Sequence, residues 1–375
     1  MRWFMTVGLV AVTSACQDGP YSKHSPFPDV PTLDGGVLSP LHLVTIVPSN
    51  DADDAPAFFD YSNTIGASVW WDRLTREYAL GGVGSSRTLM GPTITADIAD
   101  HEIFQYIEAL VASTAGVAPD GKTLYLLYLP PNVAVVSDGV RNTDCQKFGG
   151  YHHEFGIRGD NLAVIQRCAK VDPVDNMTIA ASHEIAEAVT DPSDRGYRLP
   201  VVAAQAPWTE TIWNAFEREG GAELGDLCEG TYWQEGRRVY QRIWSNAAAR
   251  KGGDPCIPKL NEPYYGVDFE QDWYPIVAGG RVAIPVRGWA TGSVGAWPLA
   301  TSVEGGAISF TATFSTNTVT LTAGAEVDLQ VAAPPGTKSG SYAVVRVASR
   351  RPPVPAGARG LTDGAHVSFV GVYVP

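Results

Sequence analysis

Residues 179–189 read I-A-A-S-H-E-I-A-E-A-V, and the interpretation of the whole chain starts from this stretch. It contains no Lys, Arg, Asn or Gln, whereas a helix on the surface of a soluble protein carries a polar face. The stretch therefore predicts a buried helix, which we place over Met177–Thr190. Asp175 or Asn176 can cap its start. Asp191-Pro192 ends it, because the residue before a proline avoids the helical region.

Three ionisable residues interrupt this apolar helix, namely His183, Glu184 and Glu187. Buried carboxylates are costly unless they are paired or bound to a metal. His183 and Glu187 are four positions apart and share a face, while Glu184 is turned by about 100° from His183. This is the arrangement of H-E-x-x-H zinc helices, which place two ligands at i and i+4 and a glutamate base beside them. A buried His–Glu network without a metal is the alternative.

The segments around this helix predict the rest of an α/β domain. Buried strands are expected over Leu41–Val47 and Thr123–Leu129, helices over Ala67–Leu80 and Ala96–Ser113, a hairpin of Gly150–Ile157 and Asn161–Cys168 around Arg158-Gly159-Asp160, and a strand over Arg238–Trp244. Strand, helices, strand, hairpin and His/Glu helix is the order of zincin-type metallopeptidase domains, in which the strand before the helix lines the substrate cleft. We therefore expect an α/β (α+β) zincin-like domain over residues 41–260.

Composition changes near Pro258–Pro263, and short runs rich in Val, Thr, Ser and Gly follow. The expected strands are Arg281–Val286, Ala307–Phe314, Thr318–Thr322, Glu326–Val331, Ser341–Ala348 and His366–Val374. About 110 residues of this pattern predict an all-β immunoglobulin-like sandwich over residues 263–375. The segment Pro335–Tyr342 resembles a strand edge common in bacterial surface sandwich domains, which usually act as spacers or binding modules.

The N-terminus predicts export. Met1-Arg2 precedes a mostly apolar stretch, residues 3–15, which is too short to span a bilayer, since about 20 residues are needed. Thr13-Ser14-Ala15-Cys16 resembles the bacterial lipoprotein cleavage box, although Thr13 stands where that pattern prefers Leu. The resemblance implies a signal over residues 1–16 and a lipid on Cys16, and simple secretion is the alternative. Residues 17–40, polar and rich in Pro and Gly, are expected to form a flexible tether.

The net charge of the chain limits the classes of partner that it can bind. The formal net charge is −13 and there is no basic run, so nucleic acid is excluded as a partner, because phosphate binding needs Lys and Arg patches. Contact with a membrane is expected only through the lipid anchor. The oligomeric state is not predicted.

Four cysteines remain beyond Cys16, namely Cys145, Cys168, Cys228 and Cys256. An even number in an exported chain predicts disulfides. Three pairings are possible, and the most local one, Cys145–Cys168 with Cys228–Cys256, is favoured. A thiolate metal site is the alternative, but the sequence contains no C-x-x-C pair.

Two segments together resemble known secreted proteins. Residues 182–192, S-H-E-I-A-E-A-V-T-D-P, and residues 223–230, E-L-G-D-L-C-E-G, resemble the plant EXORDIUM or phosphate-induced family, and also a set of secreted bacterial proteins. The bacterial proteins share the W-S-N of residues 244–246 and the G-G-D-P-C of residues 252–256. The resemblance covers roughly residues 40–260 and implies an extracellular domain with a zincin-like helix, but no particular reaction. Asp191 stands where the plant motif has Asn.

A catalytic zinc usually takes three protein ligands and a water. His183 and Glu187 are expected to supply two, and Asp226 is the preferred third because it lies in the second motif close to Cys228. Glu223 is the next candidate, and a turn residue after Gly225 is the alternative role for Asp226. Lower candidates are Asp191, Asp194, His152 and His153. The two histidines are neighbours on a strand, so at most one faces the cleft; a surface position is the preferred interpretation for them.

These residues support two functional hypotheses. In the first, the chain is an exported zinc-dependent hydrolase, a metallopeptidase, in which Glu184 is the general base toward a metal-activated water. In the second, it is a non-catalytic surface protein that binds a cell-wall polymer or polysaccharide and holds a structural metal. Two carboxylates and one imidazole widen the choice of ion from Zn to Mn or Ca. The expected partner is accordingly a peptide or a cell-surface polymer.

Overall fold

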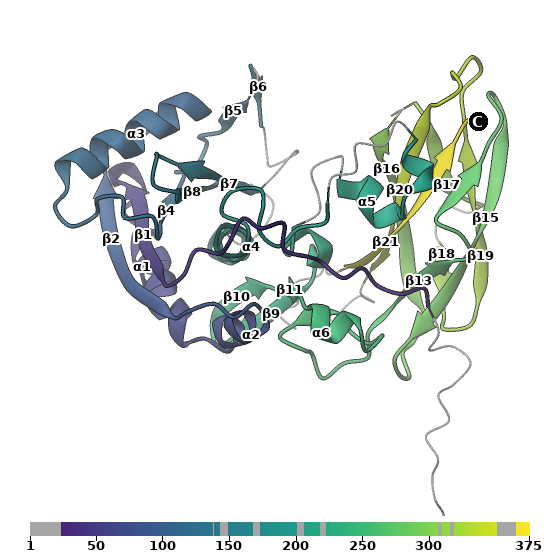
Figure 1. Ribbon diagram of the computed structural model, residues 1–375, viewed down its shortest axis with the longest axis horizontal. Helices are drawn as coiled ribbons and strands as arrows, with labels where there is room; N and C mark the ends of the chain where they lie inside the picture. Colours follow the sequence, from purple (N-terminus) through teal and green to yellow (C-terminus); the bar gives the residue numbers. More distant parts are fainter. Residues whose placement is uncertain are drawn as a thin grey trace, which may run out of the picture.

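The computed structural model describes residues 24–137, 139–142, 149–167, 173–200, 206–217, 223–306, 309–315, 319–350 and 365–375. These residues form a mixed α/β domain and an all-β domain that lie side by side (Figure 1). The predictions for Cys16, Cys145 and Cys168 fall outside the described residues. Within those ranges, no helix has the length and apolar character needed to cross a membrane.

A five-stranded sheet forms the centre of the first domain, in the order β2-β1-β4-β8-β7. Its strands are β1 (Leu41–Pro48), β2 (Val83–Gly91), β4 (Thr123–Tyr128), β7 (Gly150–Phe155) and β8 (Asp160–Ile165). The pairs β1–β2, β1–β4 and β4–β8 are parallel, whereas β7 pairs with β8 in the antiparallel direction. The sheet therefore ends in an antiparallel edge strand.

Both faces of this sheet are covered, which explains why β1 and β4 are apolar almost throughout. Leu43 and Leu126 belong to the core cluster on the side of α1 (Ala55–Thr64), α2 (Val69–Glu77) and α4 (Pro173–Thr190). Val44 and Tyr125, one position away in each strand, face the opposite cluster with α3 (Asp100–Ser113). The prediction of two buried strands is confirmed.

Some elements were not predicted. Strand β2 is partly exposed and has no continuous apolar run, and α1 lacks a clear amphipathic pattern. The strand expected over Arg238–Trp244 is interrupted at Arg242. Its first part, β10 (Arg238–Gln241), pairs with β9 (Tyr232–Glu235), and its second, β11 (Ile243–Trp244), pairs with β12 (Cys256–Ile257).

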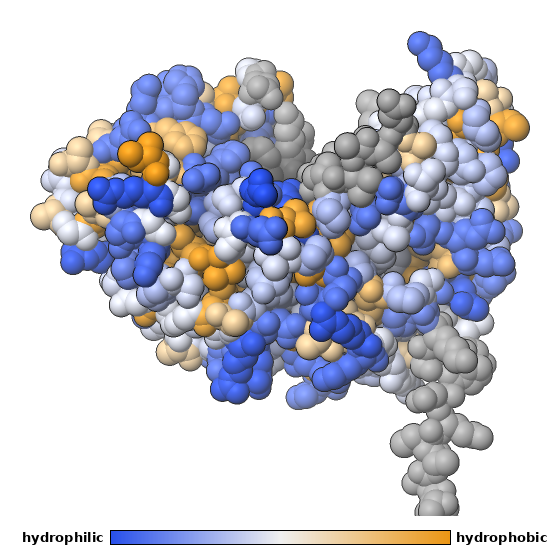
Figure 2. Space-filling view, viewed as in Figure 1, coloured by the Kyte–Doolittle hydropathy of each residue, from blue (hydrophilic) through white to orange (hydrophobic). Residues whose placement is uncertain are grey.

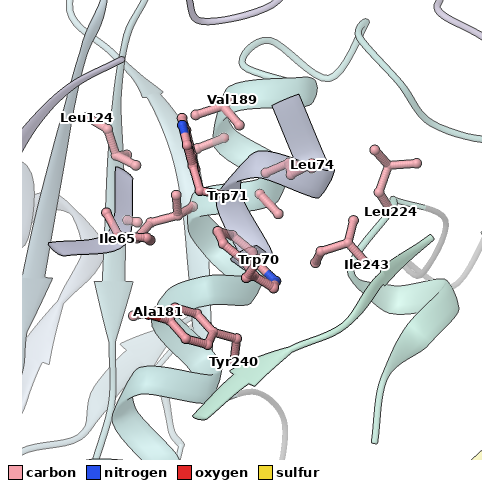
Figure 3. Packing of buried hydrophobic residues seen from close by; sticks show 14 of the residues in the cluster. Ile65, Trp70, Trp71, Leu74, Leu124, Ala181, Val189, Leu224, Tyr240 and Ile243 are labelled. Carbon is pink, nitrogen blue, oxygen red and sulfur yellow. The ribbon is translucent and has the colours of Figure 1, made fainter. Parts of the chain in front are cut away.

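Helix α4 is buried, as its composition predicts, and it begins four residues earlier than expected, at Pro173. Ala181 and Val189 have no exposed surface. In Figure 3 the helix lies beside α2, which contributes Trp70 and Trp71, and Tyr240 of β10 lies close to Ala181. A helix enclosed on these sides holds its side chains in fixed rotamers, and this rigidity positions the site described below.

The second domain is a sandwich of two sheets, in the orders β13-β15-β19-β17 and β14-β21-β20-β16-β18. Its strands are β13 (Tyr265–Phe269), β14 (Trp273–Pro275), β15 (Arg281–Ala290), β16 (Trp297–Gly306), β17 (Thr311–Phe314), β18 (Val319–Leu321), β19 (Glu326–Ala332), β20 (Tyr342–Arg350) and β21 (Ala365–Tyr373). The alternating apolar residues of both sheets meet in one core. Strands β13, β14 and β16 were not predicted.

The two domains pack against each other. Ile212 and Ala215 of α5 (Ile212–Glu217) form an apolar cluster with Trp273, Val344 and Phe369 of the sandwich. Figure 2 shows one outer face of the molecule, on which hydrophobic residues lie in small groups among hydrophilic ones.

Residues 24–40, expected to form a flexible tether, instead lie along both domains. The ring of Phe27 makes a T-shaped contact with Trp244 and lies near Trp289 of the sandwich. The backbone of Val30 exchanges two hydrogen bonds with the Asn246 side chain. Apolar side chains and backbone pairing therefore hold a segment whose composition alone favours a linker.

Candidate metal centre

His183 and Glu187 face each other on α4. Nε2 of His183 lies 3.0 Å from Oε2 of Glu187, as expected for positions four apart. Both side chains are largely buried, with 16% and 3% of their surfaces exposed. The helix thus presents an imidazole and a carboxylate toward one point.

Asp226 reaches the same point from a distant loop. Its Oδ1 lies 3.5 Å from Nε2 of His183, and its backbone N–H donates to Oε1 of Glu187 over 3.3 Å. Asp226 begins the single turn Asp226–Cys228, and Cys228 forms a disulfide with Cys256. The predicted pairing of these two cysteines is confirmed. The three predicted ligands therefore lie together, with donor atoms within 4.8 Å of one another.

Gly225 allows this close approach. A Cβ atom built at this position would lie 2.6 Å from Oε1 of Glu187 and 2.8 Å from Nδ1 of His183. The φ angle of Gly225 is −70°, which any residue adopts, so the need for glycine here is purely one of space.

His152 is the residue that sequence reasoning misjudged. A surface position was the preferred interpretation, but its side chain is only 8% exposed and its Nδ1 lies 3.4 Å from Oε2 of Glu184 and 3.8 Å from Oε2 of Glu187. The pairing of β7 with β8 sets it opposite Ala163, on the sheet face that α4 covers. His153 is exposed and lies beside Tyr151, so only one of the two histidines faces α4.

Glu184 is buried between α4 and β7. Besides the contact with His152, it lies close to Gly150, where an added Cβ would come within 2.8 Å of its Oε1. Its carboxylate borders the same cleft as His183 and Glu187. The candidate base is therefore next to the candidate ligands but belongs to a second group of donors with His152.

The lower-ranked acidic candidates gather around an arginine. Nη1 of Arg198 lies 3.4 Å from Asp191, 2.8 Å from Asp194 and 3.7 Å from Glu223. A guanidinium among these carboxylates supplies the positive charge that a metal would otherwise bring. These three carboxylates are thus poorer candidate ligands than Asp226.

The electrostatics of the cluster indicate an excess of negative charge. Burial, followed by the charge of Glu187, raises the pKa of Asp226 well above its usual range, and the same two causes raise the pKa of Glu223. Burial opposes the charged form of His183, but the charge of Glu187 prevails and raises its pKa well above the usual value. Burial also works against the charge of Glu187, yet His183 keeps the pKa of this carboxyl below its ordinary value. In the metal-free protein, bound protons therefore offset the negative charge of these buried carboxylates, which a bound cation would otherwise offset.

Gln241 is a site residue that no motif or spacing in the sequence singles out. Its Nε2 lies 2.8 Å from Nδ1 of His183 and donates to the carbonyl of Gly225 over 2.7 Å. Its backbone N–H donates to Oγ of Ser182, which fixes β10 against α4. Gln241 therefore packs against the His183 ring and ties β10 to the Gly225 loop, and its amide N–H can only donate to Nδ1.

An open cleft gives access to these residues. Its empty volume, including solvent space, is about 2160 Å³, and it is lined by the His183 cluster, by β7 and by Arg346 and Arg350 of the sandwich. The fold and the site together define an α/β domain with a His–carboxylate cluster, in a cleft that the neighbouring β-sandwich helps to form.

No protein-family model and no curated protein matches this chain. Three solved structures show a distant likeness. Domains 4 and 5 of the S-layer protein SbsC are 13% identical, with 30% of this chain and 53% of that chain covered and a TM-score of 0.21. WR4, a C. elegans MSP family member, is 14% identical, with 29% and 97% covered and a TM-score of 0.20. Domain 1 of VCBP3 from Branchiostoma floridae is 11% identical, with 30% and 97% covered and a TM-score of 0.19. At such TM-scores these likenesses support no argument about function.

Proposed function

We propose that this chain is a metal-dependent hydrolase that acts on peptide bonds, with one divalent cation held by His183, Glu187 and Asp226. The observation that carries the proposal is the convergence of one imidazole and two carboxylates from α4 and a distant loop, at the wall of an open cleft. Zinc is the preferred ion, and the two carboxylates leave Mn and Ca as alternatives.

The donor set fits a cation. Burial and the charge of Glu187 raise the pKa of Asp226, so this carboxyl lacks sufficient positive charge nearby. Oε1 of Glu223, 3.7 Å from Nη1 of Arg198, is buried and accepts no hydrogen bond from any described residue. A cation among these groups would stabilise their ionised forms, as buried charges require.

The residues around the cation have separable tasks. A bound divalent ion supplies a Lewis acid that polarises a carbonyl and acidifies a water. Glu184, one position from His183 and 3.4 Å from His152, is placed to accept the proton of the attacking water and to return it to the leaving nitrogen. Gln241 packs against the His183 ring from β10.

Strand β7 favours a peptide substrate. It is the edge strand of the sheet and carries His152 beside α4. An extended peptide can pair with the backbone of such an edge, which would align it with the cluster. This arrangement of edge strand and His/Glu helix is the main support for a zincin-like domain.

The alternative is a non-catalytic surface protein in which the metal is structural. It is favoured by the oxygen-rich donor set, because two carboxylates cancel the charge of the ion and acidify a water less. In either case we propose that the chain is exported, with Cys16 as the site of a lipid anchor, and that its sandwich is immunoglobulin-like.

The test compares the soluble chain without residues 1–23 with its His183→Ala and Glu184→Gln variants. Metal content by mass spectrometry should be about one ion per chain in the parent and in Glu184→Gln, and should be lost in His183→Ala. Peptide cleavage in a library should be abolished by Glu184→Gln. Metal without cleavage would favour the structural alternative, and a folded parent that binds no metal would refute both.

A further inference from the structure

One face of the sandwich forms part of the cleft wall. Side chains two apart on a strand share a face, and Arg346, Ala348 and Arg350 of β20 all border the cleft that contains His183. Val345 and Val347 of the same strand point into the sandwich core. The outer face of this sheet is therefore turned toward the candidate metal centre.

This wall is held in place by apolar packing. Val344, two positions before Arg346, belongs to the cluster that joins the sandwich to Ile212 and Ala215 of α5. The backbone N–H of Ala365 donates to the carbonyl of Gly230 over 3.0 Å, a second link between the domains near the cleft. These contacts fix the position of β20, and with it Arg346, relative to the Asp226 loop.

The two arginines stand out in an acidic cleft. Nη2 of Arg346 lies 3.5 Å from Oε2 of Glu229, which follows the Asp226 turn, and its side chain is 23% exposed. Arg350 is exposed at the end of β20. Glu184, Glu187 and Asp226 line the same cleft. The cleft thus contains carboxylates suited to a cation and two guanidinium groups suited to an anion.

Resting on the hydrolase proposed above, we propose that Arg346 and Arg350 bind a carboxylate of the substrate, so that the site selects acidic peptides. A guanidinium recognises a carboxylate through two parallel hydrogen bonds, with more geometric specificity than an ammonium. The carboxylate comes either from an Asp or Glu side chain or from the C-terminus of the peptide. The sandwich is then the specificity wall of the site.

The test uses the full exported chain as a metal-loaded Glu184→Gln protein, immobilised and exposed to a hexapeptide library with free or amidated C-termini. Retained peptides are identified by mass spectrometry. We expect retained peptides to be enriched about tenfold in Asp and Glu or in free C-termini, and the two library forms separate these sources. Arg346→Gln with Arg350→Gln should remove the enrichment.

Two control variants separate charge recognition from damage to the wall. Glu229→Gln breaks the ion pair of Arg346 but keeps the guanidinium, so acidic enrichment should persist or rise. Arg281→Gln changes an exposed arginine on β15, outside the cleft lining, and should have no effect.

Metal content is measured on every sample. A metal-loaded protein that retains no peptides, or retains them without acidic enrichment, overturns the inference and leaves the metal centre standing. Enrichment that survives the double arginine variant also overturns it. A parent that takes up no metal overturns the proposed function itself.

Discussion

The backbone N–H of Asp226 donates to Oε1 of Glu187 over 3.3 Å, across 39 positions of sequence. The other oxygen of Glu187 lies 3.0 Å from Nε2 of His183. One carboxylate is therefore oriented at both ends, by its helix neighbour and by a distant loop. This contact ties the position of the Asp226 side chain to the helix, and the candidate metal centre depends on it.

Asp226→Asn should lower the affinity for zinc by about 100-fold or more, because it removes a charged ligand without changing the shape of the side chain. Competition with a chromophoric chelator measures the effect. Asp194→Asn is the matched control. Because Asp194 pairs with Arg198, this substitution should lower the affinity for zinc much less. Equal losses in the two variants would contradict the assigned ligand set.

The same substitution should change how stability depends on pH in the metal-free chain. The pKa of Asp226 is raised in the folded state, first by burial and then by Glu187, so its contribution to stability is present at low pH and is lost as the pH rises. The asparagine side chain of the variant has no proton to lose. Thermal unfolding in chelator should therefore show that Asp226→Asn gains stability relative to the parent as the pH rises above about 4, the pKa of an aspartate in the unfolded chain. A stability difference that does not change with pH would contradict this prediction.

Metal uptake should be favoured by higher pH. The pKa of His183 is raised, with burial opposing the charge of Glu187, so the metal-free imidazole holds a proton that the ion must displace. Calorimetry in buffers of different ionisation enthalpy should detect proton release on zinc binding. Binding without release of protons would indicate that the ion lies elsewhere.

Gly225→Ala should weaken metal binding by roughly tenfold while the chain stays folded, because the added Cβ would meet Glu187 and His183 at under 3.0 Å and displace a ligand. Gly253→Ala is the control, since nothing lies within 4 Å of a Cβ there. Isothermal titration of both variants with zinc checks the difference. Full affinity in Gly225→Ala would mean that the loop does not contribute a ligand.

Replacing both Cys228 and Cys256 with Ser should cost about 3.6 kcal/mol of unfolding free energy, as closure of a loop with a sequence separation of 28 predicts. Zinc affinity should also fall, since Cys228 ends the turn that begins with Asp226. Urea denaturation with and without zinc measures both effects. A loss of stability with unchanged metal affinity would show that the turn holds its shape without the disulfide.

Much of the first domain was predictable, because local patterns carried the information. The apolar runs of β1 and β4 reflect a sheet that is covered on both faces, and the apolar helix around His183 can only be a buried one. Strand β2 was not predicted, and the expected tether of residues 17–40 differs from the structure over residues 24–40, for the opposite reason. Their positions depend on contacts with distant segments, and their own composition gives no sign of these contacts.

That His183 and Glu187 share a buried helical face could be read from the sequence alone, because a spacing of four residues sets that geometry in any α-helix. Asp226 was expected beside this pair because it lies in the second motif of the resemblance. The meeting of His152 and Gln241 with the pair, and the place of Arg346 in the lining of the cleft, became apparent only from the folded chain. These residues come from separate loops, strands and domains. Their convergence follows from packing of the whole chain, since no local spacing relates them.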